Sequence, residues 1–492
     1  MPIRRSSVPE PLGLAAALVP VVALVGLLGL SFFLFDDGAA SGPNQVALMF
    51  CSILAITVAW RHGHSIDDLR DAAVGSVTAG LPAIFILLSV GALIGAWALG
   101  GTLIAMVYYG LKLLDPDYFY PTACLICLVT AVSIGSSWTV AGTLGIGLMG
   151  VAREMGLDPA ITAGAVISGA YFGDKLSPLS GTANLACAAA GSNLYEHFGE
   201  SLRTSGPSLL IALVLFWSLG TPVDFDPTAM TASIEANFQP SSVHFIPLAL
   251  VLALAIMRWP PFVAIFLGAL AGGVLAVVDA PERVAAFAGG DLPHGLALLK
   301  GVWATLAGGY VSTTGEPAID ALLTRGGMAS MLGTVWLILV ALAFGGFVER
   351  AGVLERLIGP LIARARSGGA LVATLVGAAF GTNVLASDQY IAVVLPGRMF
   401  RPAFEKRGLA PVVLSRTLGD SAAVTSPLIP WNSCGAYMAA TLGVATTAYL
   451  PFAFFNLINP FLSIAFAFLG LRMLRSATTP SPDSARPTAD QP

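Results

Sequence analysis

Residues 173–184 have the sequence GDKLSPLSGTAN and lie inside an apolar stretch that runs from Pro159 to Ala190. The segment holds a carboxylate, an ammonium group, hydroxyls and a proline, a combination that does not suit a helix facing lipid. A proline within a helix removes a backbone donor and frees a carbonyl. In a membrane, such freed groups are tolerated only where they are buried in protein or line a cavity. The segment therefore predicts a membrane helix that is broken near its middle.

The composition of the whole chain supports a membrane setting. Of 492 residues, 56% are hydrophobic and only 11% are charged, and the mean hydropathy is +0.81. Ordinary soluble domains carry roughly 25% charged residues, so a soluble fold of this size would lack the charges to cover its surface. The net charge of −4 gives no sign of a nucleic-acid partner. We expect the lipid bilayer to be the main partner of this chain.

Apolar segments recur along the chain, from Leu12–Phe35 to Thr446–Leu474. A membrane-spanning helix needs about 20 apolar residues, and several of the segments are too short or are interrupted by glycine, proline or charge. Their lengths give an estimate of about 12 transmembrane helices. Arginines flank both ends, at Arg4 and Arg475. The positive-inside rule therefore predicts that both termini are cytoplasmic, in a multi-pass protein of the cell inner (plasma) membrane.

The chain also resembles itself at an offset of about 250 residues. The tripeptide SPL at 177–179 parallels SPL at 426–428, and Asn184 and Asn432 follow these prolines at similar distances. The loop at 398–407 is more basic than its counterpart, which predicts that the two copies are inverted. Inverted repeats with paired broken helices are typical of secondary transporters, whose binding site lies at the membrane midplane.

The repeat sets the predicted organisation: an all-α polytopic membrane protein with about 12 transmembrane helices in two inverted structural repeats with broken or re-entrant helices. We predict N-terminal transmembrane helices at 1–70, a first repeat at 71–220, an external linker at 221–243, connecting helices at 244–325, a second repeat at 326–475 and a disordered tail at 476–492. The linker is acidic and lacks Lys and Arg, and the tail is rich in Ser, Thr and Pro.

Two further polar segments interrupt apolar stretches. Residues 416–427 have the sequence RTLGDSAAVTSP, and residues 381–390 have the sequence GTNVLASDQY. In the first copy Trp138 falls at the position of Asp388, so this carboxylate has no predicted twin. Hard cations such as Na+ prefer carboxylate, hydroxyl, amide and carbonyl oxygens. The predicted ion- or substrate-binding residues are Asp174, Lys175, Ser177, Thr182, Asn184, Asn383, Asp388, Asp420, Thr425, Ser426 and Asn432.

Three of these residues, Asp174, Asp388 and Asp420, are the predicted Na+ ligands. Two structural alternatives remain open, because Asp174 is next to Lys175 and Asp420 lies four residues after Arg416, on one helical face. The five histidines fall in loop-like or boundary stretches and receive no role. No catalytic residue and no enzyme activity are expected, since the chain contains neither an H-E-x-x-H zinc motif nor a nucleotide-binding P-loop.

Three motifs resemble those of the NhaC family of sodium–proton antiporters. They are GAYFGDKLSPLS at 169–180, LPGRMF at 395–400 and TSPLIPWN at 425–432, within a resemblance that covers nearly the whole chain. It implies a secondary active transporter that exchanges cytoplasmic Na+ for external H+, with these coupling ions and no cofactor. Where the family usually has an acidic residue, this chain has Gly181 and Gly419.

The two glycines enlarge the predicted site and remove repulsion toward an anion. They favour, as the alternative, a sodium-coupled transporter or exchanger of a small organic acid or amino acid. The transported partner is in either case a small ion or solute, and the sequence leaves a homodimer open.

Overall fold

The structure is a computed structural model that describes residues 11–220, 227–471 and 473–475. Its regular structure is helical, and β-pairing among these residues is limited to two isolated bridges, Tyr310 with Arg325 and Leu409 with Arg475. The predicted all-α class is therefore confirmed. Arg4 and the tail predicted at 476–492 lie outside the described residues.

Seven helical segments are long and apolar enough to cross a membrane. They are α1 (Leu14–Phe35), α2 (Pro43–Arg61), α3 (Ile66–Leu99), α5 (Phe119–Ile134) with η2 (Pro116–Tyr118), α13 (Pro261–Asp279), α17 (Leu332–Arg350) with η5 (Met328–Met331), and α19 (Gly368–Ala386).

Two bent pairs raise the number of candidate spans to as many as nine in the described part of the chain. In one pair, α11 (Thr228–Asn237) meets η4 (Ser242–Phe245) and α12 (Ile246–Ile256) at 92°. In the other, α23 (Thr446–Tyr449) and η8 (Leu450–Phe452) meet α24 (Phe454–Phe468) at 57°. The estimate of 12 spans is not confirmed, because several apolar segments form short or broken helices instead.

The remaining helices are shorter or more polar. They are α4 (Thr102–Leu113), α6 (Ser137–Val140), α7 (Ile146–Glu154), α8 (Pro159–Lys175), α9 (Gly181–Ala190), α10 (Leu194–Ser218), α14 (Pro281–Ala288), α15 (His294–Gly308), α16 (Pro317–Leu323), α18 (Val353–Arg364), α20 (Gln389–Lys406), α21 (Pro411–Leu418) and α22 (Ser433–Leu442). Tighter or wider turns form η1 (Asp36–Ser41), η3 (Ala141–Gly145), η6 (Gly419–Ala423) and η7 (Ser426–Leu428). The predicted linker at 221–243 thus contains a helix, α11, and its residues 221–226 lie outside the described ones.

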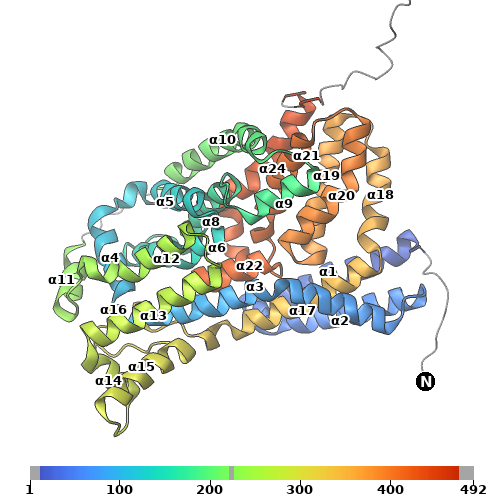
Figure 1. The fold of residues 1–492 in the computed structure, drawn as a ribbon. Helices are drawn as coiled ribbons and strands as arrows, with labels where there is room; N and C mark the ends of the chain where they lie inside the picture. The colour runs from blue at the N-terminus through green and yellow to red at the C-terminus, as the bar shows by residue number, and fades with distance from the viewer. Residues whose placement is uncertain (1–10, 221–226, 472, 476–492) are drawn as a thin grey trace, which may run out of the picture.

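The helices form two packed groups (Figure 1). In the first group, α3 packs along α13 and α17, and α2 packs against α1 and α17. In the second group, α8 packs along α5, α9 contacts α20 and α21, and α24 contacts α10 and α19. The groups meet where α17 of the first contacts α19 of the second, and α22 also contacts α3 and α17. Elements far apart in the sequence, such as α9 and α20, therefore lie side by side.

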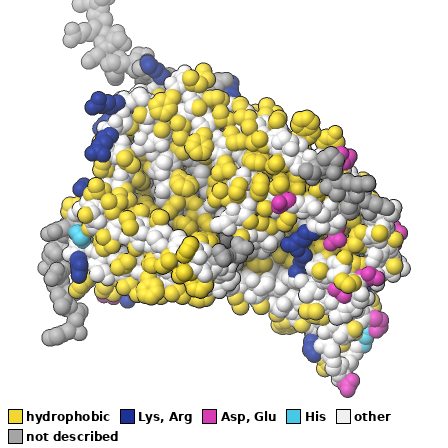
Figure 2. Space-filling view, turned by 180° about the vertical axis from the view of Figure 1, so that it is seen from behind, with side chains coloured by type: hydrophobic (Ala, Val, Ile, Leu, Met, Phe, Trp, Pro, Cys, Tyr) yellow, Lys and Arg dark blue, Asp and Glu magenta, His cyan; other side chains and the backbone are white. Residues whose placement is uncertain are grey.

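The outer surface is apolar over a broad area (Figure 2). Large hydrophobic side chains such as Phe33, Val278 and Phe461 are 71–82% exposed. A water-soluble protein rarely exposes apolar patches beyond a few hundred Å², whereas lipid-facing helices do so as a rule. The surface confirms that the chain is a multi-pass membrane protein.

Glycines allow a close helix contact between α5 and α8. A Cβ atom at Gly169 would lie 2.0 Å from the carbonyl oxygen of Cys124, and one at Gly173 would lie 2.4 Å from that of Leu128. Small residues let membrane helices approach until their backbones touch. This packing holds the last turn of α8, and with it Asp174, against the end of α5.

Substitution of Gly169 with valine should therefore disrupt the α5–α8 contact. Overpacking of a tight core costs about 1–3 kcal/mol or more, so the apparent unfolding temperature of the detergent-purified protein should fall. Gly199 on α10 is the matched control, since it is exposed and a Cβ there meets nothing within 4 Å. Gly199→Ala should leave the unfolding temperature unchanged or raise it, and an equal loss in both variants would contradict the packing argument.

Candidate functional site

Two helices are interrupted at matching positions in the two halves of the chain. Helix α5 ends at Gly135 and α19 at Ser387, both in the left-handed conformation with φ of 75° and 58°. The next residue then caps the following helix in each case. The Ser136 hydroxyl accepts from Thr139 N at 3.2 Å, and Asp388 Oδ1 accepts from Ile391 N at 2.9 Å.

These matching positions are 252 residues apart (387 − 135). The structural counterpart of Asp388 is therefore Ser136, two residues before the position given by the sequence comparison, which chose Trp138. The repeat preserves the positions of backbone breaks and helix caps but not the identity of the side chains. An alignment based on residue identity is therefore displaced by two residues at this position. The observation that Asp388 has no carboxylate twin is unaffected.

A second pair of breaks has the same separation. Ser180 caps α9 by accepting from Ala183 N at 3.2 Å, and Asn432 caps α22 by accepting from Cys434 N at 3.0 Å. Both helices end at left-handed glycines, Gly191 and Gly443. Asn432 thus corresponds to Ser180 and not to Asn184, whose amide instead donates to the carbonyl of Ser180 at 2.7 Å.

The breaks meet around a cavity of about 640 Å³. Its lining comes from the starts of α6, α9, α20 and α22, from α3, and from the loop that joins α12 to α13. Of the predicted site residues, four line this cavity: Asp174, Thr182, Asn184 and Asp388. Gly181, where the resemblance leads one to expect an acidic residue, lines it as well, and a Cβ atom there would meet nothing within 4 Å.

The two carboxylates of the cavity are almost fully buried. Asp174 is 9% exposed and Asp388 is 7% exposed. Asp174 Oδ2 accepts from the backbone nitrogen and the hydroxyl of Ser137, at 3.1 and 2.8 Å. Neither carboxylate has an ion-pair partner within the described part of the chain, so the predicted alternative of a pair between Asp174 and Lys175 does not form. Arg258 lines the cavity as well but pairs with neither carboxylate, so the lining carries a net negative charge when both are ionised and attracts a cation or a proton.

Four predicted residues form a buried amide and hydroxyl network beside the cavity instead of lining it. Asn383 donates to the Ala422 carbonyl at 2.7 Å and to the Thr425 hydroxyl at 3.1 Å. Asn432 donates to the carbonyl of Asn383 at 3.1 Å, and the Ser426 hydroxyl bonds the side chain of Gln389 at 3.1 Å. These contacts satisfy the polar groups that the unwound segment between η6 and α22 would otherwise leave unpaired.

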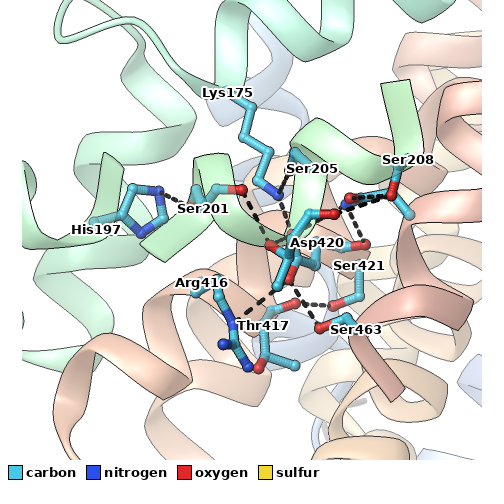
Figure 3. A network of polar contacts seen from close by, with 12 residues as sticks. Lys175, His197, Ser201, Ser205, Ser208, Arg416, Thr417, Asp420, Ser421 and Ser463 are labelled. Atoms are coloured by element: carbon cyan, nitrogen blue, oxygen red, sulfur yellow. Dashed lines mark hydrogen bonds and ion pairs between the residues drawn. The ribbon is translucent and has the colours of Figure 1, made fainter. Parts of the chain in front are cut away.

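Asp420 belongs to a separate, fully buried cluster (Figure 3). Its carboxylate forms an ion pair with Lys175, and Arg416 lies at 3.7 Å, as the spacing of four residues predicts. Asp420 also accepts hydrogen bonds from neutral groups, namely Thr204 at 3.2 Å, Asn459 at 3.0 Å and Ser463 at 2.8 Å. Asp420 and Lys175 are 0% and 2% exposed, and they join η6 of the second half to α8 of the first. Ser177 remains in the break after α8, where its hydroxyl accepts from Leu179 N.

His197 is a member of this cluster that the sequence analysis missed. It is fully buried, and its two ring nitrogens contact the hydroxyls of Ser415 at 3.1 Å and Ser201 at 3.4 Å. A Cβ atom at Gly419 would lie 3.2 Å from Lys175 Cε and 3.5 Å from the His197 ring, so this glycine makes room for both side chains. The sequence contains a pattern that could have predicted this burial, because His197, Ser201 and Ser208 lie on one face of α10 at helical spacing.

Comparison with known proteins gives consistent matches. The model of the Na+/H+ antiporter family matches residues 169–471. The chain is 36% identical to the Na(+)/H(+) antiporter NhaC of Alkalihalophilus pseudofirmus over 87% of this chain and 90% of the relative. It is 33% identical to the malate-2H(+)/Na(+)-lactate antiporter of Bacillus subtilis over 92% of this chain and 95% of the relative.

A third relative is the arginine/ornithine antiporter ArcD of Halobacterium salinarum, which is 33% identical over 96% of this chain and 95% of its own length. Each of the three matches covers at least 87% of this chain. The family model covers well over half of the sequence, including Asp174, Asp388 and Asp420. The chain therefore belongs to the Na+/H+ antiporter family.

Proposed function

We propose that this protein is a secondary active transporter of the cell inner membrane that exchanges cytoplasmic Na+ for external H+, with both termini in the cytoplasm. The observation that carries the proposal is the pair of buried carboxylates, Asp174 and Asp388, that share one cavity without an ion-pair partner among the described residues. A buried carboxylate is stable when a proton or a cation neutralises it. An antiporter needs a group that holds either one, but not both, at a time.

The chemistry of the cavity suits Na+ as a substrate. Na+ is a hard cation and takes oxygen ligands, and the carboxylates of Asp174 and Asp388 are joined there by the side chains of Thr182 and Asn184. The starts of α6, α9, α20 and α22 line the same cavity, and Ser137 at the start of α6 donates its backbone N–H and its hydroxyl to Asp174.

One aromatic ring of the cavity lining, that of Trp138, is stacked on a second ring, that of Tyr437. Trp138 of α6 and Tyr437 of α22 stack with ring centroids 4.0 Å apart, and the Tyr437 hydroxyl donates to the Trp138 carbonyl at 2.8 Å. Helix α22 runs from the cavity, at Ser433, to a second pocket at Thr441, and the stack lies between them. In the transport cycle that we propose, separation of this stack opens the cavity toward the second pocket.

Asp420 has a structural role in this proposal. Its carboxylate already accepts from Lys175 and from three neutral donors, so it offers little capacity for Na+. It holds the first half of the chain to the second through a buried ion pair. Asp174 and Asp388 remain as the proposed Na+ ligands.

A second candidate function is the exchange of a small organic acid or amino acid. The supporting observation is the size of the cavity, about 640 Å³, which is in the range of small-molecule sites and much larger than a dehydrated ion requires. The open space at Gly181 adds to this volume. Two of the relatives are antiporters of lactate and malate and of arginine and ornithine.

Replacement of Asp174 or Asp388 with asparagine should abolish sodium-driven proton movement. In liposomes that enclose a pH-sensitive dye, the rate after Na+ addition should fall by at least about tenfold, the effect of losing about 1.4 kcal/mol of ion binding. Asp291→Asn is the matched control, since Asp291 is exposed on the loop before α15. Retained exchange in both cavity variants would refute the assignment, and labelled lactate or arginine uptake in the same vesicles tests the second candidate.

Crosslinking of the aromatic stack should stop transport. Cysteines in place of Trp138 and Tyr437, joined by a short reducible crosslinker, would hold α6 against α22 and keep the cavity closed toward the second pocket. Exchange should cease on linking and return on reduction, whereas each single-cysteine variant should be unaffected by the reagent. The five native cysteines are buried, but Cys434 lines the cavity, so all variants in this assay also carry Cys434→Ala. Unchanged exchange in the linked protein would show that the stack is not a gate.

Asp420→Asn should destabilise the protein more than it changes ion specificity. Breaking a buried ion pair costs about 3–5 kcal/mol, because the remaining charge stays buried. The apparent unfolding temperature should drop sharply, and the double variant Lys175→Met/Asp420→Asn should recover part of the loss. A stable Asp420→Asn protein whose apparent affinity for Na+ is lost would instead place Asp420 in the ion site.

A further inference from the structure

A second pocket, of about 530 Å³, lies at the other end of α22 from the carboxylate cavity. It is lined by the C-terminal end of α22, by Ile146 at the start of α7 and by the loop after α16. A neighbouring pocket of about 360 Å³ shares part of this lining, including Thr334 and Gly443. The charged side chains of this lining are both arginines, Arg153 and Arg325.

The backbone of Arg325 is fixed in place. Its nitrogen donates to the Tyr310 carbonyl at 3.0 Å, and its carbonyl accepts from Tyr310 N at 3.1 Å. The next two residues, Gly326 and Gly327, have φ of 86° and 83°. A Cβ atom at Gly326 would lie 2.2 Å from the backbone nitrogen of Gly95 on α3. A loop that requires two left-handed glycines and touches the α3 backbone presents Arg325 at a defined position in the pocket.

The two guanidinium groups have no close counterion. Neither makes an ion pair or a side-chain hydrogen bond with another residue that the structure describes. Arg153 also lies against the C-terminal end of α22, since its Nη2 atom is 3.3 Å from the Cβ position of Gly443. Glu154, the residue after Arg153, does not line the pocket, so the charged groups of its lining are both positive.

A buried hydroxyl lies beside these charges. Thr441 lines the pocket and is 5% exposed. Its hydroxyl forms no hydrogen bond of normal geometry, although it lies close to the phenol of Tyr437. Buried polar groups in proteins usually have partners, so a group in this state is available to a ligand that enters the pocket.

We infer that this second pocket binds a small organic carboxylate, with Arg325 and Arg153 holding the carboxylate and Thr441 contributing a hydroxyl. The planar guanidinium fork matches a carboxylate with two parallel hydrogen bonds. The apolar side chains of Ile94, Met331 and Leu442 in the same lining suit the carbon chain of an organic acid better than they suit phosphate. The positive charge of the arginines disfavours Na+ as a bound ligand, so the pocket suits the organic substrate of the second candidate function as a binding site, whereas Na+ would only pass through it.

This inference rests on the second candidate function and is tested by binding, independently of ion movement. The full-length protein, purified in detergent, is heated in increasing potassium lactate or potassium malate, with potassium chloride and potassium phosphate at equal ionic strength as references. A ligand that binds the folded state raises the unfolding temperature in a saturable way. The variants are Arg325→Gln and Thr441→Val. Arg258→Gln tests the carboxylate cavity, which Arg258 lines, and Arg364→Gln on the exposed face of α18 is the matched control.

The expected result is a saturable rise with lactate or malate that chloride and phosphate do not give. The half-saturating concentration should increase roughly tenfold in Arg325→Gln and about fivefold in Thr441→Val, as for the loss of a charged and of a neutral hydrogen bond. It should not change in Arg258→Gln or Arg364→Gln. If Arg325→Gln fails to fold, Thr441→Val decides the question.

Three results would overturn the inference: no saturable rise with either carboxylate, an equal rise with phosphate, or a loss of binding in Arg258→Gln alone. The last result would move the carboxylate to the first cavity. Sodium–proton exchange measured in chloride medium is independent of each of these outcomes, so failure of the inference and failure of the proposed exchange are distinguishable.

Discussion

The absence of water in the membrane interior is the constraint on which this structure depends. Every backbone group that a broken helix exposes there must find a partner in the protein. The chain meets this demand with four side-chain caps, at Ser136, Ser180, Asp388 and Asn432. Because the helix starts are satisfied locally, the chain can bring four of them to one cavity. The polar cavity is thus a direct consequence of the helix breaks, because the capped helix starts themselves line it.

The same constraint explains why two consecutive residues at the end of α8 have different roles. Asp174 lines the cavity and is held by neutral donors, whereas Lys175 pairs with Asp420 in the second half of the chain. Neighbouring positions on a helix point in different directions, so one short stretch supplies both an ion-site carboxylate and a contact between the halves. A movement of one half against the other would therefore act on both residues through the last turn of α8.

Much of this organisation could be predicted from the sequence. The low charge content predicted the membrane setting, the prolines and polar residues predicted the breaks, and internal similarity gave an offset of about 250 residues, close to the 252-residue spacing of the paired breaks. The number of spans was not predictable, because segments such as α4 are apolar without being long enough to cross. The partner of Asp388 was also misplaced, since a backbone break can be kept while the side chain that caps it changes from Ser136 to an acid. His197 was missed because its burial depends on a helix, α10, whose polar face meets a distant part of the chain.

Asp388 has two functions at once, since the carboxylate that lines the cavity is also the first structural contact of α20. Any proton or cation that this carboxylate takes up weakens it as an acceptor for Ile391 N, because its charge is then shared. The strength with which α20 is fixed at its start is thereby linked to what the cavity contains. In the first half the same position holds Ser136, a neutral cap whose strength does not vary with occupancy. The two halves therefore differ in mechanical response as well as in charge. The stability of the start of α20 changes when the cavity takes up an ion, whereas that of the start of α6 does not.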